Sequence, residues 1–263
     1  MEFKVIDFHT HPFDKREHNI CDHTDFCNMS LENSKEGLQS LGISKICGTV
    51  IKIFGGVPSW QEIQALNDEA LLIRDKYGDF YCPGFHVHPA YVKESIAEIF
   101  RMKNEGVKLI GELVPYTQGW NDYSCPEFSE ILDAAEECNM LVSFHSMGED
   151  QMDAMVKKHP NVTFIAAHPG EYPEFMRHME RMKFSDNYYL DLSGYGILRY
   201  GMIRHAVDLF GPEKFIFGSD YPTCNPAMYL GAVRDDYLLT DEEKKLILSE
   251  NAERLLKKAF EKT

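Results

Sequence analysis

Eight short apolar segments alternate with amphipathic stretches along the whole chain, and this alternation constrains the fold more than any other feature. Each segment is rich in Val, Ile, Leu, Phe or Tyr and is bounded by Gly, Pro, Asn or Asp, which is typical of buried β-strands. The eight expected strands are residues 5–9, 45–51, 80–87, 107–114, 140–145, 162–168, 188–192 and 214–218.

The stretches between these segments have the spacing of amphipathic helices, as in Ile63, Leu66, Ala70 and Ile73. Eight strand–helix units in 263 residues match the size of a (β/α)8 barrel, which is about 250 residues. A doubly wound open sheet is the rival, but the GxGxxG motif expected after its first strand is absent. The sequence therefore predicts the α/β class: a (β/α)8 TIM barrel as one domain over residues 1–263, with a long loop after the first strand.

Charge and composition narrow the class of partner. The chain carries 27 Lys and Arg against 42 Asp and Glu, a formal charge of −15, which disfavours nucleic acid and anionic membranes. No apolar run reaches the ~18–20 residues of a membrane span. Seven cysteines without a CxxC motif, and a start without a leader, predict reduced thiols and a cytoplasmic protein. We expect a small-molecule substrate, and we leave open whether the chain forms a homo-oligomer.

Side chains that bind metals stand at the end of five of the eight expected strands. The first strand leads into His9 and His11, which point to the same face because they are two residues apart. In a barrel, the carboxyl ends of all strands open on one rim, where catalytic groups gather. The other strand ends on this rim carry Glu112, His145, His168 and Asp220. Imidazole and carboxylate ligands together suit zinc, manganese or iron, so the sequence predicts a metal centre.

Three segments carry a resemblance to a known family. They are Ile6-Asp7-Phe8-His9-Thr10-His11, Ala167-His168-Pro169-Gly170 and Gly218-Ser219-Asp220-Tyr221-Pro222. In these segments the chain resembles the amidohydrolase superfamily of metal-dependent barrel hydrolases, and above all its amidohydrolase-2 branch. That branch includes hydrolases, lactonases, hydratases and aromatic-acid decarboxylases. The resemblance extends to Asn251-Ala252-Glu253-Arg254-Leu255 near the end of the chain.

The resemblance implies the ligands of a divalent metal, with Zn²⁺ foremost and Mn²⁺ or Fe²⁺ as alternatives. His9, His11 and Asp220 would bind the metal, His145 would be a further ligand, and His168 would be a ligand or a hydrogen-bond donor. Binuclear members often carry a carbamylated lysine at the end of the fourth strand, where this chain has Glu112. Glu112 would either bridge two ions or orient a ligand histidine, so both one and two ions stay open.

The expected chemistry is hydrolysis of an amide, lactone or related carbonyl compound by a water that the metal activates. In this scheme Asp220 is the catalytic proton shuttle, and His168 stabilises the developing negative charge. The main alternative is metal-dependent, non-oxidative decarboxylation of an unsaturated or aromatic acid. A TatD-like phosphodiesterase and a non-catalytic metal-binding barrel are further alternatives. The charge of −15 opposes the phosphodiesterase, and Asp220 opposes the non-catalytic barrel.

Four other side chains are candidates for substrate binding. Lys52 and Arg199 are cations that suit an acid group, Tyr195 suits a ring, and His88 ends the third expected strand. Surface or structural roles compete with this interpretation for all four. The polar loop after the first strand, which contains Cys21 and Cys27, is expected to lie at the rim as a lid. Its cysteines resemble half of a zinc knuckle, which would form a separate site.

Overall fold

The computed structural model describes residues 3–21 and 29–261, with side chains up to residue 259. Eight parallel strands form one sheet in which each strand pairs with the next along the chain. The strands are β1 (Val5–Thr10), β2 (Ile43–Gly48), β3 (Tyr81–Phe85), β4 (Leu109–Leu113), β5 (Leu141–His145), β6 (Thr163–Ala167), β7 (Tyr188–Asp191) and β8 (Phe215–Ile216). This topology confirms the expected α/β class.

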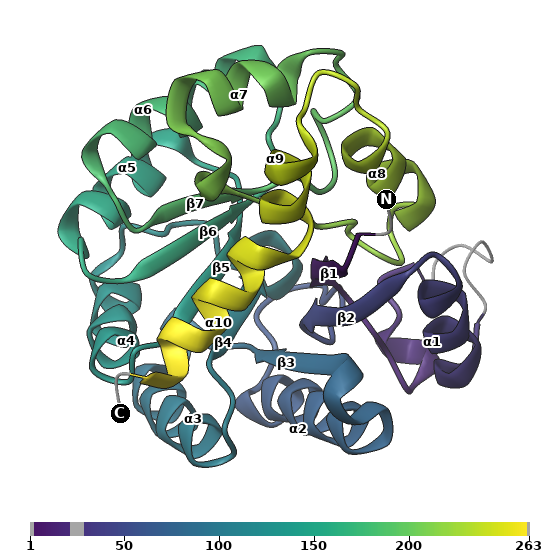
Figure 1. Ribbon diagram of the computed structural model, residues 1–263. Helices are drawn as coiled ribbons and strands as arrows, with labels where there is room; N and C mark the ends of the chain where they lie inside the picture. The colour runs from purple at the N-terminus through teal and green to yellow at the C-terminus, as the bar shows by residue number, and fades with distance from the viewer. Residues whose placement is uncertain (1–2, 22–28, 262–263) are drawn as a thin grey trace.

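The last strand returns to the first, so the sheet closes. Phe8 donates its backbone N–H to the carbonyl of Phe217 at 2.9 Å, and beyond β8 the chain forms a parallel bridge between Thr10 and Tyr221. Figure 1 shows the helices arranged around this ring of strands. The fold is a (β/α)8 barrel, as predicted.

Eight helices follow the strands, and two more close the chain. They are α1 (Leu31–Ser40), α2 (Trp60–Tyr77), α3 (Val92–Asn104), α4 (Pro126–Glu137), α5 (Glu149–Lys158), α6 (Tyr172–Phe184), α7 (Met202–Phe210), α8 (Pro226–Arg234), α9 (Asp241–Lys245) and α10 (Asn251–Glu261). A π-helical turn, Leu246–Glu250, joins the last two. Short 3₁₀ turns lie at Arg16–His18, Gly78–Phe80, Pro89–Tyr91, Pro115–Gln118 and Pro212–Lys214. None of these helices, in the residues described, is long and apolar enough to cross a membrane.

Two apolar clusters hold the barrel together. The larger lies between the strands and the surrounding helices. The smaller fills the interior, where Ile6, Leu109 and Ile165 pack under Leu255 of α10. Figure 1 shows α10 lying across this end of the barrel. Because α10 closes the amino-terminal end of the strands, the interior is reached from the opposite rim, where the predicted site residues stand.

The loop after β1 is only partly described. Its first part is attached to α2, because the carboxylate of Glu69 accepts the backbone N–H groups of Asp14 and Lys15 at 2.8 and 3.1 Å. Residues 22–28 lie outside the described part of the chain, so the lid and the zinc knuckle expected there stay predictions.

Candidate metal centre

Glu112, which β4 carries toward the rim, lies at the centre of the candidate site. One carboxylate oxygen, Oε2, is 2.9 Å from His9 Nε2 and 3.1 Å from His11 Nε2. The other, Oε1, is 3.1 Å from His145 Nδ1 and 3.5 Å from His168 Nε2. Glu112 is only 3% exposed. A single buried carboxylate therefore joins two groups of histidines, one on each of its oxygens.

Asp220 completes the first of these groups. Its Oδ1 lies 3.6 Å from the Nε2 atoms of both His9 and His11. Its backbone N–H donates to the carbonyl of His9 at 2.9 Å, which ties the chain after β8 to β1. We call His9, His11, Glu112 and Asp220 the first cluster, and Glu112, His145 and His168 the second cluster. The structure thus brings together all six predicted ligands.

Two of these residues have an unusual backbone conformation. His168 and Asp220 have φ values of +69° and +60°, in the left-handed region that residues other than glycine rarely adopt. Such a conformation costs on the order of 1 kcal/mol or more, and it persists where the surrounding structure imposes it. His168 directly follows β6 and Asp220 lies shortly after β8, and the side chains of both reach the rim site.

Hydrogen bonds on the far side of each ring orient the histidines of the first cluster. His11 Nδ1 lies 3.1 Å from the carbonyl of Thr49, which can only accept, so Nδ1 carries the proton. His9 Nδ1 donates to the carboxylate of Asp191 at 2.9 Å. The Nε2 atom of each ring therefore faces Glu112, and the two Nε2 atoms are 3.2 Å apart.

The charges in the first cluster favour a positive charge between Glu112 and Asp191. Burial raises the pKa of Glu112, but the charge of His9 and hydrogen bonds from His11 and His145 outweigh burial and hold that pKa well below its usual value. Burial lowers the pKa of His9, but the charges of Glu112 and Asp191 outweigh it and raise that pKa well above normal. Without a metal ion, a proton on His9 supplies the positive charge between these acceptors.

A divalent metal fits this donor set. Ligand atoms that bind one ion at about 2.0–2.2 Å lie roughly 3 Å from one another, as the Nε2 and Oε2 atoms of the first cluster do. Three overlapping groups of donor atoms each lie within 4.8 Å. Two of them belong to the first and second clusters, and the third contains His9, His168 and Asp191. Imidazole with carboxylate suits zinc, manganese or iron.

Sequence reasoning missed Asp191, the last residue of β7, and Ser193, which follows it. Asp191 is fully buried; burial raises its pKa, but the charge and hydrogen bond of His9 outweigh burial and lower it overall. The Ser193 hydroxyl lies 2.9 Å from His9 Nδ1 and 3.0 Å from His168 Nδ1. The signal was the one that revealed the ligands: a carboxylate and a hydroxyl at the carboxyl end of a barrel strand.

The four predicted substrate-binding residues do not join the clusters. Arg199 is 56% exposed and forms an ion pair with Glu171, Tyr195 is 64% exposed, and Lys52 lies over the ring of Phe54. His88 uses both ring nitrogens on the backbone: Nδ1 accepts from the N–H of Ala90 at 3.0 Å, and Nε2 donates to the carbonyl of Gln118 at 3.0 Å. In the described chain, no hydrogen bond or ion pair links these four residues to the six ligands. Their substrate roles stay predictions.

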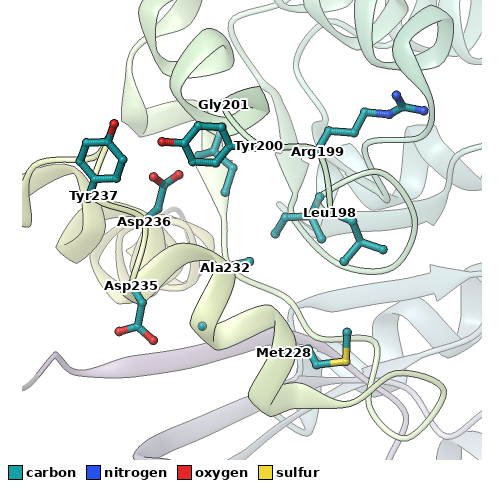
Figure 2. A pocket seen from close by; sticks show the side chains of 12 residues that line it. Leu198, Arg199, Tyr200, Gly201, Met228, Ala232, Asp235, Asp236 and Tyr237 are labelled. Atoms are coloured by element: carbon teal, nitrogen blue, oxygen red, sulfur yellow. The ribbon is translucent and has the colours of Figure 1, made fainter.

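A surface pocket lies beside Arg199, at the loop before α7 and along α8. It has a volume of about 360 Å³, and its lining includes Tyr200, Met228 and Tyr237 but none of the six ligands. Figure 2 shows the guanidinium of Arg199 pointing away from Met228 and Tyr237. This pocket is therefore a feature separate from the two clusters.

The ring of Tyr116 contacts the second cluster. Its ring packs edge-on against the ring of His145 with centroids 5.3 Å apart, yet 57% of the residue is exposed. Burial raises the pKa of Tyr116, and the charges of Glu112 and Asp220 raise it further. Tyr116 therefore keeps its proton at neutral pH and presents a phenol at the rim.

A parallel barrel with histidines and carboxylates at the carboxyl ends of its strands is typical of metal-dependent barrel enzymes. The chain matches the family model described as amidohydrolase over residues 6–258, and it belongs to this family. Family and donor set together support an enzyme that uses a divalent metal. A comparison with curated proteins finds no match.

Solved structures show the same fold at low sequence identity. An uncharacterized TIM-barrel protein from Bordetella bronchiseptica is 20% identical with a TM-score of 0.75, over 97% of this chain and 99% of that one. A probable 2-pyrone-4,6-dicarboxylic acid hydrolase from Acinetobacter baumannii is 17% identical with a TM-score of 0.69, over 98% and 100%. A dihydroxybenzoic acid decarboxylase from Polaromonas, with bound manganese and the inhibitor 2-nitroresorcinol, is 12% identical with a TM-score of 0.71, over 97% of each chain.

Proposed function

We propose that this protein is a metal-dependent hydrolase that opens an amide, lactone or related carbonyl group of a small molecule. One observation carries the proposal: Glu112 directs one carboxylate oxygen at His9 and His11, and the other at His145 and His168. A carboxylate in this position can bridge two ions. Two ions about 3.5–4 Å apart can hold an attacking water and a substrate carbonyl together.

The first cluster would hold one ion through His9, His11, Glu112 and Asp220. The second would hold another through Glu112, His145 and His168. Zn²⁺ suits the donors best, and Mn²⁺ and Fe²⁺ are the alternatives. When bound, such an ion lowers the pKa of its water from 15.7 to about 7 and polarises a carbonyl.

Asp220 is the proposed proton shuttle. Its carboxylate lies at the mouth of the first cluster, 3.6 Å from two ligand nitrogens, and it is 8% exposed. From this position Asp220 accepts a proton from the attacking water and returns it to the leaving group. General base catalysis of this kind contributes about 10²–10⁴-fold to the rate.

Two roles remain, that of a further metal ligand and that of a hydrogen-bond donor to the substrate, and we assign them to His168 and Tyr116. Burial lowers the pKa of His168, so its ring is neutral, and Nδ1 faces the Ser193 hydroxyl at 3.0 Å. A neutral ring that donates through Nδ1 offers only a lone pair at Nε2, which suits a metal ligand rather than a hydrogen-bond donor. The protonated phenol of Tyr116 takes the role of donor to the developing negative charge.

The second candidate is the decarboxylase, and the likeness in fold to the manganese-containing decarboxylase favours it. That reaction needs a cation to hold the substrate acid group. The two candidate cations are engaged elsewhere, Arg199 with Glu171 and Lys52 over Phe54. Because both candidate cations are engaged, and because Glu112 faces histidines on both of its oxygens, we favour the hydrolase.

Two probe reactions on zinc- and manganese-loaded protein distinguish the candidates. The first uses 2-pyrone-4,6-dicarboxylate and simple lactones and records acid production at constant pH. The second uses dihydroxybenzoates and records carbon dioxide release. Metal-dependent acid production that the Asp220→Asn substitution lowers by 10²-fold or more supports the hydrolase. Carbon dioxide release without acid production contradicts it.

A further inference from the structure

We propose that Asp191 and Ser193 are positioning residues that hold one tautomer in two ligand histidines, His9 directly and His168 through the serine hydroxyl. The proposal deepens the proposed function and relies on it for the two metal ions. The chain of hydrogen bonds from His168 through Ser193 to Asp191 does not require a metal ion.

The first step is the state of Asp191. Its side chain is fully buried, and both of its oxygens accept hydrogen bonds. Oδ2 accepts from His9 Nδ1 at 2.9 Å, while Oδ1 accepts the backbone N–H of Ser193 at 2.9 Å and also the Ser193 hydroxyl. A carboxylate with these partners has no proton to give, so every group around it must donate.

The second step follows from counting protons on Ser193. The hydroxyl has a single hydrogen, and it donates this hydrogen in a hydrogen bond to Asp191. The Ser193 oxygen can then act only as an acceptor toward His168 Nδ1 at 3.0 Å and His9 Nδ1 at 2.9 Å. His168 must therefore carry its proton on Nδ1. The result is a chain in which His168 donates to Ser193, Ser193 donates to Asp191, and His9 donates to Asp191 from the other side.

The third step connects this chain to the metal clusters. Because Nδ1 of both rings is used for donation, Nε2 is the atom that each ring would offer to a metal ion; the Nε2 atoms of His9 and His168 lie 2.9 Å and 3.5 Å from the two oxygens of Glu112. A ligand histidine is oriented by the partner of its other nitrogen. The carboxylate of Asp191 therefore orients one ligand histidine in each cluster, His9 directly and His168 through Ser193.

The backbone beside Ser193 shows how closely this support is packed against His168. Gly194 has φ +55°, and a Cβ atom at this position would lie 2.1 Å from His168 Nδ1. Only glycine allows the chain to pass so close to the ring while Ser193 keeps its hydroxyl on the ring nitrogen. The imidazole of His168 is therefore held both by contact and by a hydrogen bond.

Nitrogen NMR of protein labelled with ¹⁵N-histidine tests the arrangement without any metal. In the metal-free wild type, we expect His168 to be protonated on Nδ1. In Ser193→Ala, the acceptor is lost, and we expect His168 to shift toward the Nε2-protonated tautomer. If His168 keeps its Nδ1 proton in Ser193→Ala, the proposal is overturned, whatever the enzyme's reaction is.

Metal titration provides the second readout, with zinc as the probe. We expect Ser193→Ala to weaken the second cluster by about 10–100-fold and to leave the first unchanged, because His9 still donates to Asp191. The isosteric Asp191→Asn presents an amide to His9 and should weaken both clusters. Equal affinities in wild type and both variants would overturn the proposal.

A matched control separates positioning from general stability. Ser129 lies 2.8 Å from Nε2 of the buried His159, in a contact of the same kind on α4. Ser129→Ala should leave both zinc affinities and the His168 tautomer unchanged. If the wild type binds only one zinc ion, the two-metal function fails, while the NMR experiment still decides the role of Ser193.

Discussion

His9 Nε2 lies 2.9 Å from Glu112 Oε2 in a part of the barrel that is almost closed to solvent. Because His9 Nδ1 donates to Asp191, the facing atoms of this pair are both acceptors when the ring is neutral. Two acceptors at this distance repel each other unless a proton or a metal ion lies between them. This contact therefore connects the fold of the protein to the chemistry that we propose.

Removal of metal should destabilise the protein. A metal ion that binds only the folded chain adds about 4 kcal/mol at a free concentration 1,000 times its Kd. For a chain of this size, that corresponds to a fall in Tm on the order of 10 °C when a chelator removes the ion. Thermal unfolding with and without chelator measures it. An unchanged Tm in protein shown to have carried metal would contradict this expectation.

Replacement of Tyr116 should affect catalysis and leave metal binding intact. The Tyr116→Phe variant keeps the ring contact with His145 and removes only the phenol. Loss of one donor to a developing oxyanion costs about 10²–10³-fold in kcat. Tyr91→Phe is the control, because Tyr91 donates its hydroxyl to the carbonyl of Pro58. A Tyr116→Phe variant with wild-type kcat would remove Tyr116 from the mechanism.

The free energy of unfolding should decrease at acid pH because His86 is buried in its neutral form. Burial lowers the pKa of this ring to about 4; Nε2 donates to the carbonyl of Val50, and Nδ1 accepts from Gln118. An unfolded histidine has a pKa of about 6.5, so between these values the unfolded chain binds a proton that the folded chain does not. The contribution of His86 is therefore present above pH 6.5 and is lost as the pH falls toward 4.

Comparison with the His86→Gln variant isolates this effect from other acid groups. At about 1.4 kcal/mol per pKa unit, the stability advantage of the wild type should shrink by about 2 kcal/mol between pH 7 and pH 5. Denaturant unfolding at both pH values measures the difference. An advantage that stays constant with pH would show that His86 is not held neutral.

The sequence was sufficient to predict the barrel and the convergence of the six candidate ligands, because one physical rule covers both. Parallel strands direct their carboxyl ends to one rim, so His9, His145 and Asp220 converge although they are far apart along the chain. The same rule extends to β7, where Asp191 ends the strand and Ser193 follows, but no histidine in that segment indicates a site.

Other features depend on contacts that no local pattern encodes. The repeated His-x-His at His86 and His88 resembles the ligand pair of β1, but backbone groups of Val50, Ala90 and Gln118 engage these rings. The second strand was expected over 45–51, but β2 ends at Gly48. Gly48 has φ +148°, and a side chain there would collide with the Thr10 carbonyl at 1.8 Å.

Metal stoichiometry tests the central claim most directly. Elemental analysis of protein loaded with zinc should give close to two ions per chain in the wild type. Glu112→Gln removes the bridging charge and should lower the value to one or less. Glu98→Gln, which changes a buried glutamate paired with Arg101, should keep two. One ion in the wild type, or two in Glu112→Gln, would contradict the account of Glu112 as the residue that joins two metal sites.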